Sequence, residues 1–245
     1  MLNNPLILVA TDFSEHSDYA VKAGEEVRKK SGGVLHLINI SRKEDGLTFL
    51  QHEMDKQISR CEALCTHEIV TGKAYQVLNE YIEKMQPGML IMGHKGRDLN
   101  HHFIGSLTSR MVASAKVPVM VVNNYLEVSK VTGLVDIEEL EKKVFQVSEE
   151  LSFLFNSDLE FLSVIPDISA QIARRSPIMS SEHESYSASE RASLTKKAES
   201  KIRENLDSRV NAKVNVAIVE SDKTAEEINK KLNLAKAGLV VMARH

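Results

Sequence analysis

The chain has 245 residues, with 31 lysines and arginines against 34 aspartates and glutamates, a hydrophobic fraction of 42% and two cysteines. This length corresponds to one or two globular domains, and the net charge of -3 argues against a general nucleic-acid binder, which carries a basic excess. No apolar run reaches the roughly 18 residues that span a bilayer, and the N-terminal segment lacks the basic region of a signal peptide. We therefore expect a cytoplasmic protein that binds neither nucleic acid nor membranes.

Short apolar runs, typical of buried strands, alternate along the first half with segments of helical spacing. The expected strands are residues 6–10, 34–40, 66–70, 89–92 and 117–122, and the expected helical segments are 19–27, 47–64, 74–85 and 106–114. Alternation of this kind requires a parallel sheet with helices on both faces. The two cysteines, Cys61 and Cys65, fall near the expected end of one helix, where their spacing is poor for a structural disulfide and where two thiols alone make no zinc site.

The second half repeats this pattern. An offset of 124 residues aligns Asp136 with Asp12 and Val164 with Ile40, and an offset of 150 aligns Gly238 with Gly88. The difference of 26 residues indicates an insertion, which the polar, serine-rich segment 166–189 accommodates as a long loop. We therefore predict two domains, 1–124 and 125–245, with the second ending before a counterpart of the fifth strand.

Glycine is distributed unevenly between the two halves, with nine residues in 1–124 and two in 125–245. Three of the nine, Gly93, Gly96 and Gly105, lie between an expected buried strand and the helix that starts at Ser106. In open α/β sheets ligands bind outside the carboxyl ends of the strands, and glycines at a helix N-terminus let backbone N–H groups approach a phosphate. Considered alone, this loop is also compatible with an ordinary turn.

The segments LVATDFSEHSDYA and MGHKGRDLNHHFIGSLTSRMVASAKVPVMVV resemble the nucleotide-binding branch of the universal stress protein family. The family pattern is Gly, two residues, Gly, nine residues, Gly, then Ser or Thr. The resemblance is clear over residues 5–124 and fainter over 130–243. It implies a Rossmann-like open parallel sheet of strand order 3-2-1-4-5 in each of two tandem domains, the second without its fifth strand, and it implies binding of ATP together with Mg²⁺ held by the phosphates.

The resemblance also assigns residues to the ligand. The positions that would hold the ribose and phosphates are Gly93, Gly96, Gly105 and Ser106. Asp12 and the backbone near Ile40 would hold the adenine, and Met92 would line its site. Asp12 alone is equally compatible with a helix cap. The loop departs from the family pattern, because eight residues instead of nine separate Gly96 from Gly105.

Two hypotheses of different classes follow. In the first, domain 1 alone binds ATP and the chain acts as a nucleotide-dependent sensor or regulator in the stress response. In the second, favoured by the shortened spacer, the chain binds no nucleotide and is a structural or interaction module of the same fold. Neither half offers a positioned general base or nucleophile, so we expect no catalytic residues and at most slow ATP hydrolysis or autophosphorylation.

Two further expectations concern metal ions and assembly. The loop histidines His94, His101 and His102 have no supporting cluster of Cys or carboxylate ligands, so we predict no protein-built metal site. The apolar fifth strand, 117–122, would be an exposed sheet edge in domain 1, and such edges pair readily. We therefore expect a homodimer in which two of these strands pair across a two-fold axis.

Overall fold

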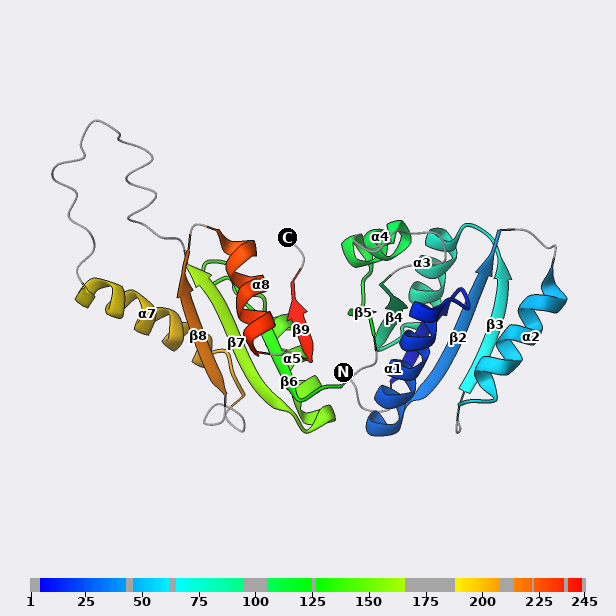
Figure 1. The fold of residues 1–245 in the computed structure, drawn as a ribbon, viewed down its shortest axis with the longest axis horizontal. Helices are drawn as coiled ribbons and strands as arrows, with labels where there is room; N and C mark the ends of the chain where they lie inside the picture. The colour runs from blue at the N-terminus through cyan, green and yellow to red at the C-terminus, as the bar shows by residue number, and fades with distance from the viewer. Residues whose placement is uncertain are drawn as a thin grey trace, which may run out of the picture. The chain divides into compact units, whose positions relative to one another are not determined.

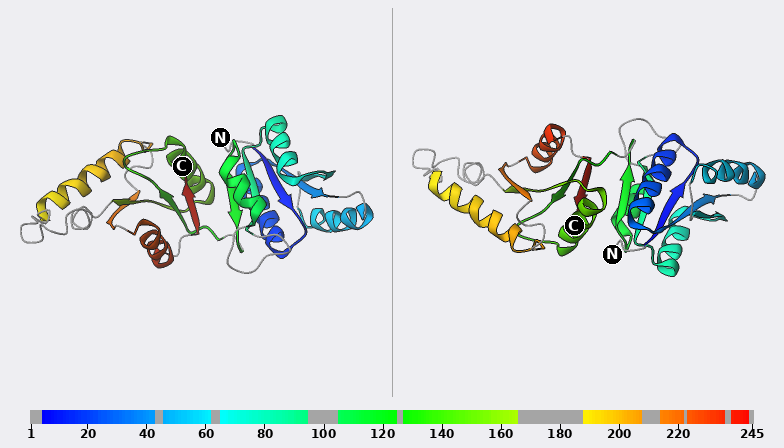
Figure 2. Two further views of the ribbon diagram at one scale, coloured as in Figure 1. Left: turned by 90° about the horizontal axis from the view of Figure 1, so that it is seen from above. Right: turned by 90° about the horizontal axis from the view of Figure 1, so that it is seen from below.

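The computed structural model describes residues 5–42, 46–61, 65–94, 105–124, 127–165, 188–207, 214–221, 223–235 and 238–243. The chain divides into two compact units, the first reaching Glu127 and the second beginning at Val128. Each unit is an open α/β sheet with helices on both faces (Figures 1 and 2). Gly96 and nearly all of the predicted insertion 166–189 lie outside the described residues.

The first unit is built on the five-stranded parallel sheet A, whose strand order β3-β2-β1-β4-β5 confirms the prediction. Its strands are β1 (Leu6–Thr11), β2 (Val34–Ser41), β3 (Cys65–Thr71), β4 (Met89–Gly93) and β5 (Val119–Val122). Its helices are α1 (Glu15–Ser31), α2 (Leu47–Ile58), α3 (Ala74–Met85) and α4 (Ser106–Ser114). Sheet A is covered by α1 and α2 on one face and by α3 and α4 on the other (Figure 1).

The centre of sheet A is buried from both sides, as the continuous apolar run in β1 predicts. Ile7, Leu8 and Val9 are all fully buried. Gly24 of α1 lies so close to the sheet that a Cβ atom there would be 2.7 Å from Cγ2 of Val9 and 2.8 Å from Cδ1 of Leu35. This close approach fixes α1 against the first two strands.

The ends of α1 follow from local chemistry. The Ser14 side chain caps the helix by accepting a hydrogen bond from the backbone N–H of Ser17. Gly32 ends it in the left-handed conformation, with φ of 71°. Acidic residues lie in the first turn and basic residues in the last, where each favours the helix dipole.

One expected helix is shorter than predicted. The predicted helix 47–64 ends at Ile58, and β3 already begins at Cys65. Backbone N–H groups after the helix form tight turns instead, with Cys61 N–H donating to the carbonyl of Ile58 at 2.8 Å. Cys61 therefore lies after α2, whereas Cys65 begins β3. The fifth strand is also shorter than predicted, since it covers Val119–Val122 rather than 117–122.

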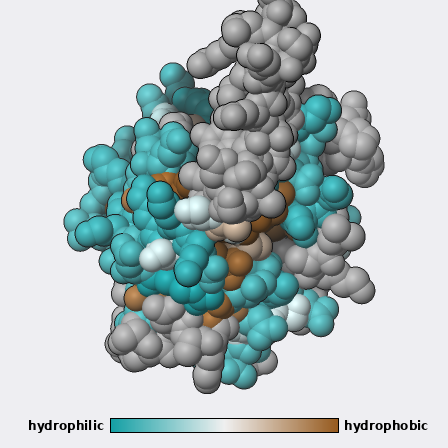
Figure 3. All heavy atoms as spheres, turned by 90° about the vertical axis from the view of Figure 1, so that its left-hand side faces the viewer, coloured by the Kyte–Doolittle hydropathy of each residue, from teal (hydrophilic) through white to brown (hydrophobic). Residues whose placement is uncertain are grey.

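The second unit is built on the four-stranded parallel sheet B, of order β8-β7-β6-β9. Its strands are β6 (Lys130–Leu134), β7 (Asp158–Ile165), β8 (Asn215–Glu220) and β9 (Leu239–Met242), and its helices are α5 (Lys142–Phe155), α7 (Ala188–Arg203) and α8 (Thr224–Ala235). In sequence terms this order is 3-2-1-4, and within the described residues sheet B has no fifth strand. The outer side of this unit seen in Figure 3 is mostly hydrophilic, with separate hydrophobic areas between the polar side chains.

In both units the first helix packs tightly on the first strand. The glycine that allows this contact is on the helix in the first unit and on the strand in the second. In the first unit Gly24 of the helix faces Val9 of the strand. The offset of 124 residues takes these positions to Ser148 and Gly133. A Cβ atom at Gly133 would lie 2.9 Å from Oγ of Ser148. The same close packing is thus reached with glycine on the strand, which agrees with duplication of one domain.

Candidate functional site

The strand order of sheet A creates one topological switch point, between β1 and β4. From β1 the chain crosses to β2 on one side, and β4 pairs with β1 on the other. In open α/β sheets, ligands bind outside the carboxyl ends of the strands at such a switch point, because the connections leave it in opposite directions. Asp12 directly follows β1, and Gly93 is the last residue of β4. The structure therefore brings these two predicted site residues to the same part of the sheet edge.

Asp12 shapes the turn between β1 and α1. Its Oδ1 accepts a hydrogen bond of 3.1 Å from the backbone N–H of Ser14, which makes it an Asx turn. Phe13 between them has φ of 60°, a conformation that a bulky side chain rarely adopts. The Thr11 hydroxyl accepts the N–H of Phe13 at 3.2 Å and helps to hold it. Such strain persists where the surroundings enforce it, and it is concentrated at functional sites.

Gly93 lies against the first turn of α1. A Cβ atom at this position would be 2.8 Å from both the carbonyl carbon and the oxygen of His16, so only glycine fits. The Gly93 carbonyl accepts a hydrogen bond of 3.1 Å from the Thr108 hydroxyl, which joins β4 to α4. The Thr108 side chain is buried, and its hydroxyl is used within the protein.

The two ends of the glycine loop are held together. The N–H of His94 donates to the carbonyl of Val122 at 2.7 Å, and the carbonyl of His94 accepts the N–H of Gly105 at 2.9 Å. The first of these bonds extends the pairing of β4 with β5, and the second returns the chain to β4 where α4 begins. Gly105 is the buried N-cap of α4 and Ser106 is its exposed first residue. Because the N-cap has no side chain, no side-chain cap occupies the N-terminal N–H groups of α4.

Ile40 and Met92 occupy the face of sheet A that α3 and α4 cover. Met92 is 4% exposed and belongs to the hydrophobic cluster on that face, and Ile40 is partly buried against the same cluster. Both residues therefore pack below the edge that carries Asp12 and Gly93. Gly96, the remaining predicted site residue, lies outside the described residues.

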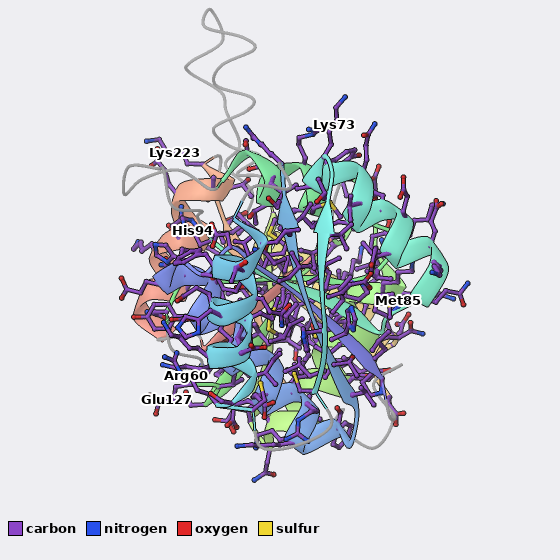
Figure 4. The ribbon with its side chains drawn as sticks, turned by 90° about the vertical axis from the view of Figure 1, so that its right-hand side faces the viewer. Arg60, Lys73, Met85, His94, Glu127 and Lys223 are labelled. Atoms are coloured by element: carbon purple, nitrogen blue, oxygen red, sulfur yellow. The ribbon has the colours of Figure 1, made fainter. Side chains whose placement is uncertain are left out.

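His16 was missed in the sequence. Its Nδ1 lies 3.3 Å from the carbonyl oxygen of Asn123, and its ring centroid lies 6.4 Å from that of His94 (labelled in Figure 4). Two imidazoles therefore lie close to each other at the end of β4. The sequence feature that could have indicated His16 is its position four residues after Asp12, in the first turn of the helix that follows β1.

Two properties of the described residues bear on the other predictions. No group of three or more His, Cys, Asp or Glu side chains among them is arranged to hold a metal ion. In the same ranges, no helix is both long and apolar enough to cross a membrane.

Comparisons with known proteins agree with this geometry. A profile of the universal stress protein family matches residues 5–123, whereas no curated protein matches the sequence. The crystal structure of a universal stress protein from Archaeoglobus fulgidus is 15% identical, with a TM-score of 0.67, and the match covers 99% of this chain and 87% of that one. A functionally unknown protein from Pseudomonas aeruginosa is 12% identical with a TM-score of 0.63, covering 98% and 82% of the two chains.

At these identities the structural likeness shows the fold alone, but it extends over both units of the chain. The family match is carried by the first unit, in which the sheet order, the turn after β1 and the glycine loop all lie. The match to the universal stress protein family therefore covers the first unit, over residues 5–123.

Proposed function

We propose that the first unit binds ATP at the switch point of sheet A, with Mg²⁺ held through the nucleotide phosphates. The observation that carries this proposal is the 2.9 Å hydrogen bond from Gly105 N–H to the carbonyl of His94. It closes the loop and holds the N-terminus of α4 beside the end of β4. Uncapped N–H groups and the positive end of the helix dipole there favour a phosphate group.

The proposed ligand contacts follow the positions of the residues. We assign Gly93, Gly96 and Gly105 to the ribose and phosphates, because none of them has a side chain that would keep the ligand away from the backbone. The exposed Ser106 hydroxyl adds a donor at the start of α4. Asp12 and the backbone at Ile40 hold the adenine, and Met92 lines the floor beneath it.

The second unit differs at the equivalent positions. Asp136 corresponds to Asp12, but Ala243 stands where Gly93 lies in the first unit. We therefore assign one nucleotide to each chain and a packing or regulatory role to the second unit. The proposed role of the whole chain is that of a nucleotide-dependent regulator of the stress response.

Calorimetric titration of the full chain with Mg-ATP tests this proposal. We expect one nucleotide bound per chain and no binding to Gly105→Val, because a valine side chain at the N-cap blocks the approach of the phosphates. Ser106→Ala should weaken binding, whereas Ser109→Ala, an exposed serine one turn further along α4, should leave it unchanged. Absence of binding to the unmodified chain would favour the interaction module, and two nucleotides per chain would contradict the assignment to the first unit.

We also propose a homodimer formed by β5. Within the described residues this strand pairs only with β4, so its other edge is free for a second copy. The carbonyls of Pro118 and Val122 bond to β4, and alternation along a strand therefore directs the backbone groups of Val119 and Val121 outward.

Val121→Pro removes one of these outward N–H groups and leaves the bonds to β4 in place. We expect light scattering to give the mass of a dimer for the unmodified chain and a shift towards monomer for this variant, with unchanged circular dichroism. A monomeric unmodified chain at micromolar concentration would contradict the proposal.

A further inference from the structure

The two cysteines of the chain lie near the amino end of β3, at the end of sheet A opposite to the proposed nucleotide site. Cys61 follows the end of α2, and Cys65 is the first residue of β3, where it pairs in register with Leu35. Arg60, directly before Cys61, lies at the opposite end of the first unit from Lys73, which follows β3 (Figure 4). Both thiols are free and half-buried.

The surroundings of the thiols come from α1 as well as from α2 and β3. Leu35, the register neighbour of Cys65, lies beneath α1 next to Gly24. The following residues of α1 include Glu25 and Arg28, which form a buried ion pair with a distance of 3.1 Å from Oε2 to Nη2. Oε1 of Glu25 and Nε of Arg28 have no hydrogen-bond partner, although both atoms are buried. The ion pair is thus only partly satisfied within α1 and stands beside the two thiols.

The surroundings of the two thiols shift their pKa values in opposite directions. The hydrogen bond with Cys61, assisted by the Arg28 charge, lowers the pKa of Cys65, although burial and the Glu25 carboxylate oppose this shift. The same hydrogen bond, together with burial, raises the pKa of Cys61. Since the thiolate is the reactive form of cysteine, we assign Cys65 as the nucleophile of the pair.

A small reactant can reach both thiols, because each is partly exposed, and Cys61 has a cavity beside it. Cys61 lines a cavity of about 240 Å³ between α1 and the end of α2, together with Glu25 and Gln57. The thiol of Cys61 lies 3.6 Å from the carbonyl of Gln57 at one wall of this cavity. The volume exceeds the approximately 30 Å³ that one water molecule occupies in the liquid, so the cavity has room for a hydroperoxide.

We propose that Cys61 and Cys65 form a site of reversible oxidation, at which a hydroperoxide converts the two thiols into a disulfide within the chain. The inference rests on the position of one thiol after α2 and the other at the start of β3, on the hydrogen bond between them and on the cavity beside Cys61. It does not depend on the proposed nucleotide binding, because the residues concerned lie at the other end of the sheet.

The reaction balances in two steps. The sulfur of Cys65 attacks one oxygen of the peroxide, the O–O bond breaks, and Cys65 becomes a sulfenic acid while the other oxygen leaves as water or alcohol after taking a proton. The sulfur of Cys61 then attacks the sulfur of the sulfenic acid, and the S–O bond breaks. The hydroxyl oxygen leaves as water with the thiol proton of Cys61. The two thiols lose two electrons in total, the peroxide gains them, and a dithiol reductant reverses the change.

Hydrogen peroxide with the reduced full chain provides the test. Intact mass spectrometry should show the loss of two hydrogen atoms from a chain that is not cross-linked to another, and dithiothreitol should restore the original mass. The chain has two cysteines, and peptide mapping of the oxidised chain should identify a bond between them as the source of this change. Unchanged free thiols after treatment, or disulfides only between chains, would overturn the proposal.

Two single substitutions separate the roles of the thiols. Cys61→Ser should stop the reaction at the sulfenic acid, which dimedone traps on Cys65. Cys65→Ser should leave a thiol that reacts with peroxide many-fold more slowly than Cys65 does. Equal peroxide reactivity of the two variants would overturn the assignment of Cys65 as the nucleophile.

Discussion

Asp12 and Asp136 accept the same hydrogen bond at the same place in the two units. Oδ1 of Asp12 accepts the N–H of Ser14 at 3.1 Å after β1, and Oδ1 of Asp136 accepts the N–H of Glu138 at 2.8 Å shortly after β6. Both aspartates therefore form an Asx turn beyond the first strand of a sheet. They differ in their surroundings, because Ala243 stands in the second unit where Gly93 lies in the first.

This pair offers a matched test of the nucleotide proposal. We expect Asp12→Ala to weaken Mg-ATP binding strongly and Asp136→Ala to leave it unchanged, although both substitutions remove the same backbone contact. Calorimetric titration measures the affinity, and circular dichroism checks that both variants are folded. Equal losses in the two variants would mean that the turn supports the fold rather than the ligand.

A buried polar network beneath this turn should contribute to stability. The Thr11 hydroxyl donates to Oε1 of Gln57 at 3.0 Å, and Nε2 of Gln57 donates to Oδ1 of Asp18 at 2.7 Å. Thr11→Val keeps the shape of the side chain but leaves the Gln57 oxygen without this donor. Leaving a buried polar group unsatisfied costs about 1–3 kcal/mol, and we expect a loss of this size in urea denaturation. The exposed Thr71 provides the control, since Thr71→Val should change stability by less than about 0.5 kcal/mol.

His36 should make the first unit sensitive to acid. It is buried, its Nδ1 lies 2.8 Å from Oγ1 of Thr66, and its ring stacks on Tyr81. Burial lowers the pKa of His36, the Glu68 carboxylate opposing this effect and His67 adding to it. In the unfolded chain histidine titrates near about 6.5, so the unfolded state binds the proton first as the pH falls.

Stability from this residue is therefore complete above about pH 6.5 and is lost as the pH falls below it, through the lower pKa of the folded state. We expect His36→Gln to flatten the decrease of the thermal midpoint between pH 8 and 5, measured by circular dichroism. His52→Gln, at an exposed position of α2, should leave that decrease unchanged. A pH profile identical in His36→Gln and the unmodified chain would contradict this assignment.

The end of α3 should tolerate glycine better than its native residue. Gln86 is exposed and ends the helix with φ of 46°, in the left-handed region. Gln86→Gly removes the steric cost of this conformation, and we expect a gain of about 0.5–1 kcal/mol in the free energy of unfolding. Gln76→Gly, within the same helix, should instead destabilise the protein by about 1 kcal/mol. Shifts of the same sign in both variants would contradict the backbone argument.

The sequence predicts the regular parts of the fold because their signals are local. The fully buried run from Ile7 to Val9 contains enough apolar residues to identify a strand that is covered on both faces. The cap at Ser14 and the stop at Gly32 are also encoded by adjacent residues. The end of α2 at Ile58 was not predicted, because no glycine or proline marks it and the helix is largely polar.

The candidate site was predicted only where its residues are close in sequence. The sequence pattern predicted that Gly93 is a glycine so that a phosphate can approach the backbone. The structure adds a second reason, because a side chain there would collide with the backbone of His16. That contact joins residues far apart in the chain, so no spacing rule reveals it. The exchange of glycine between Gly24 and Gly133 was equally hidden, because alignment of the halves pairs each glycine with a different residue.

The close seating of α1 on sheet A makes this helix a rigid connection between two chemically different ends. Its first turn carries His16, beside the glycine loop, and its later turns carry Arg28, beside the thiols. These two residues are about 18 Å apart along a helix that rises 1.5 Å per residue. Because Gly24 contacts Val9 and Leu35 without room for another atom, the middle of this helix is fixed to the sheet. The proposed nucleotide site and the proposed thiol pair are therefore connected by one closely packed helix.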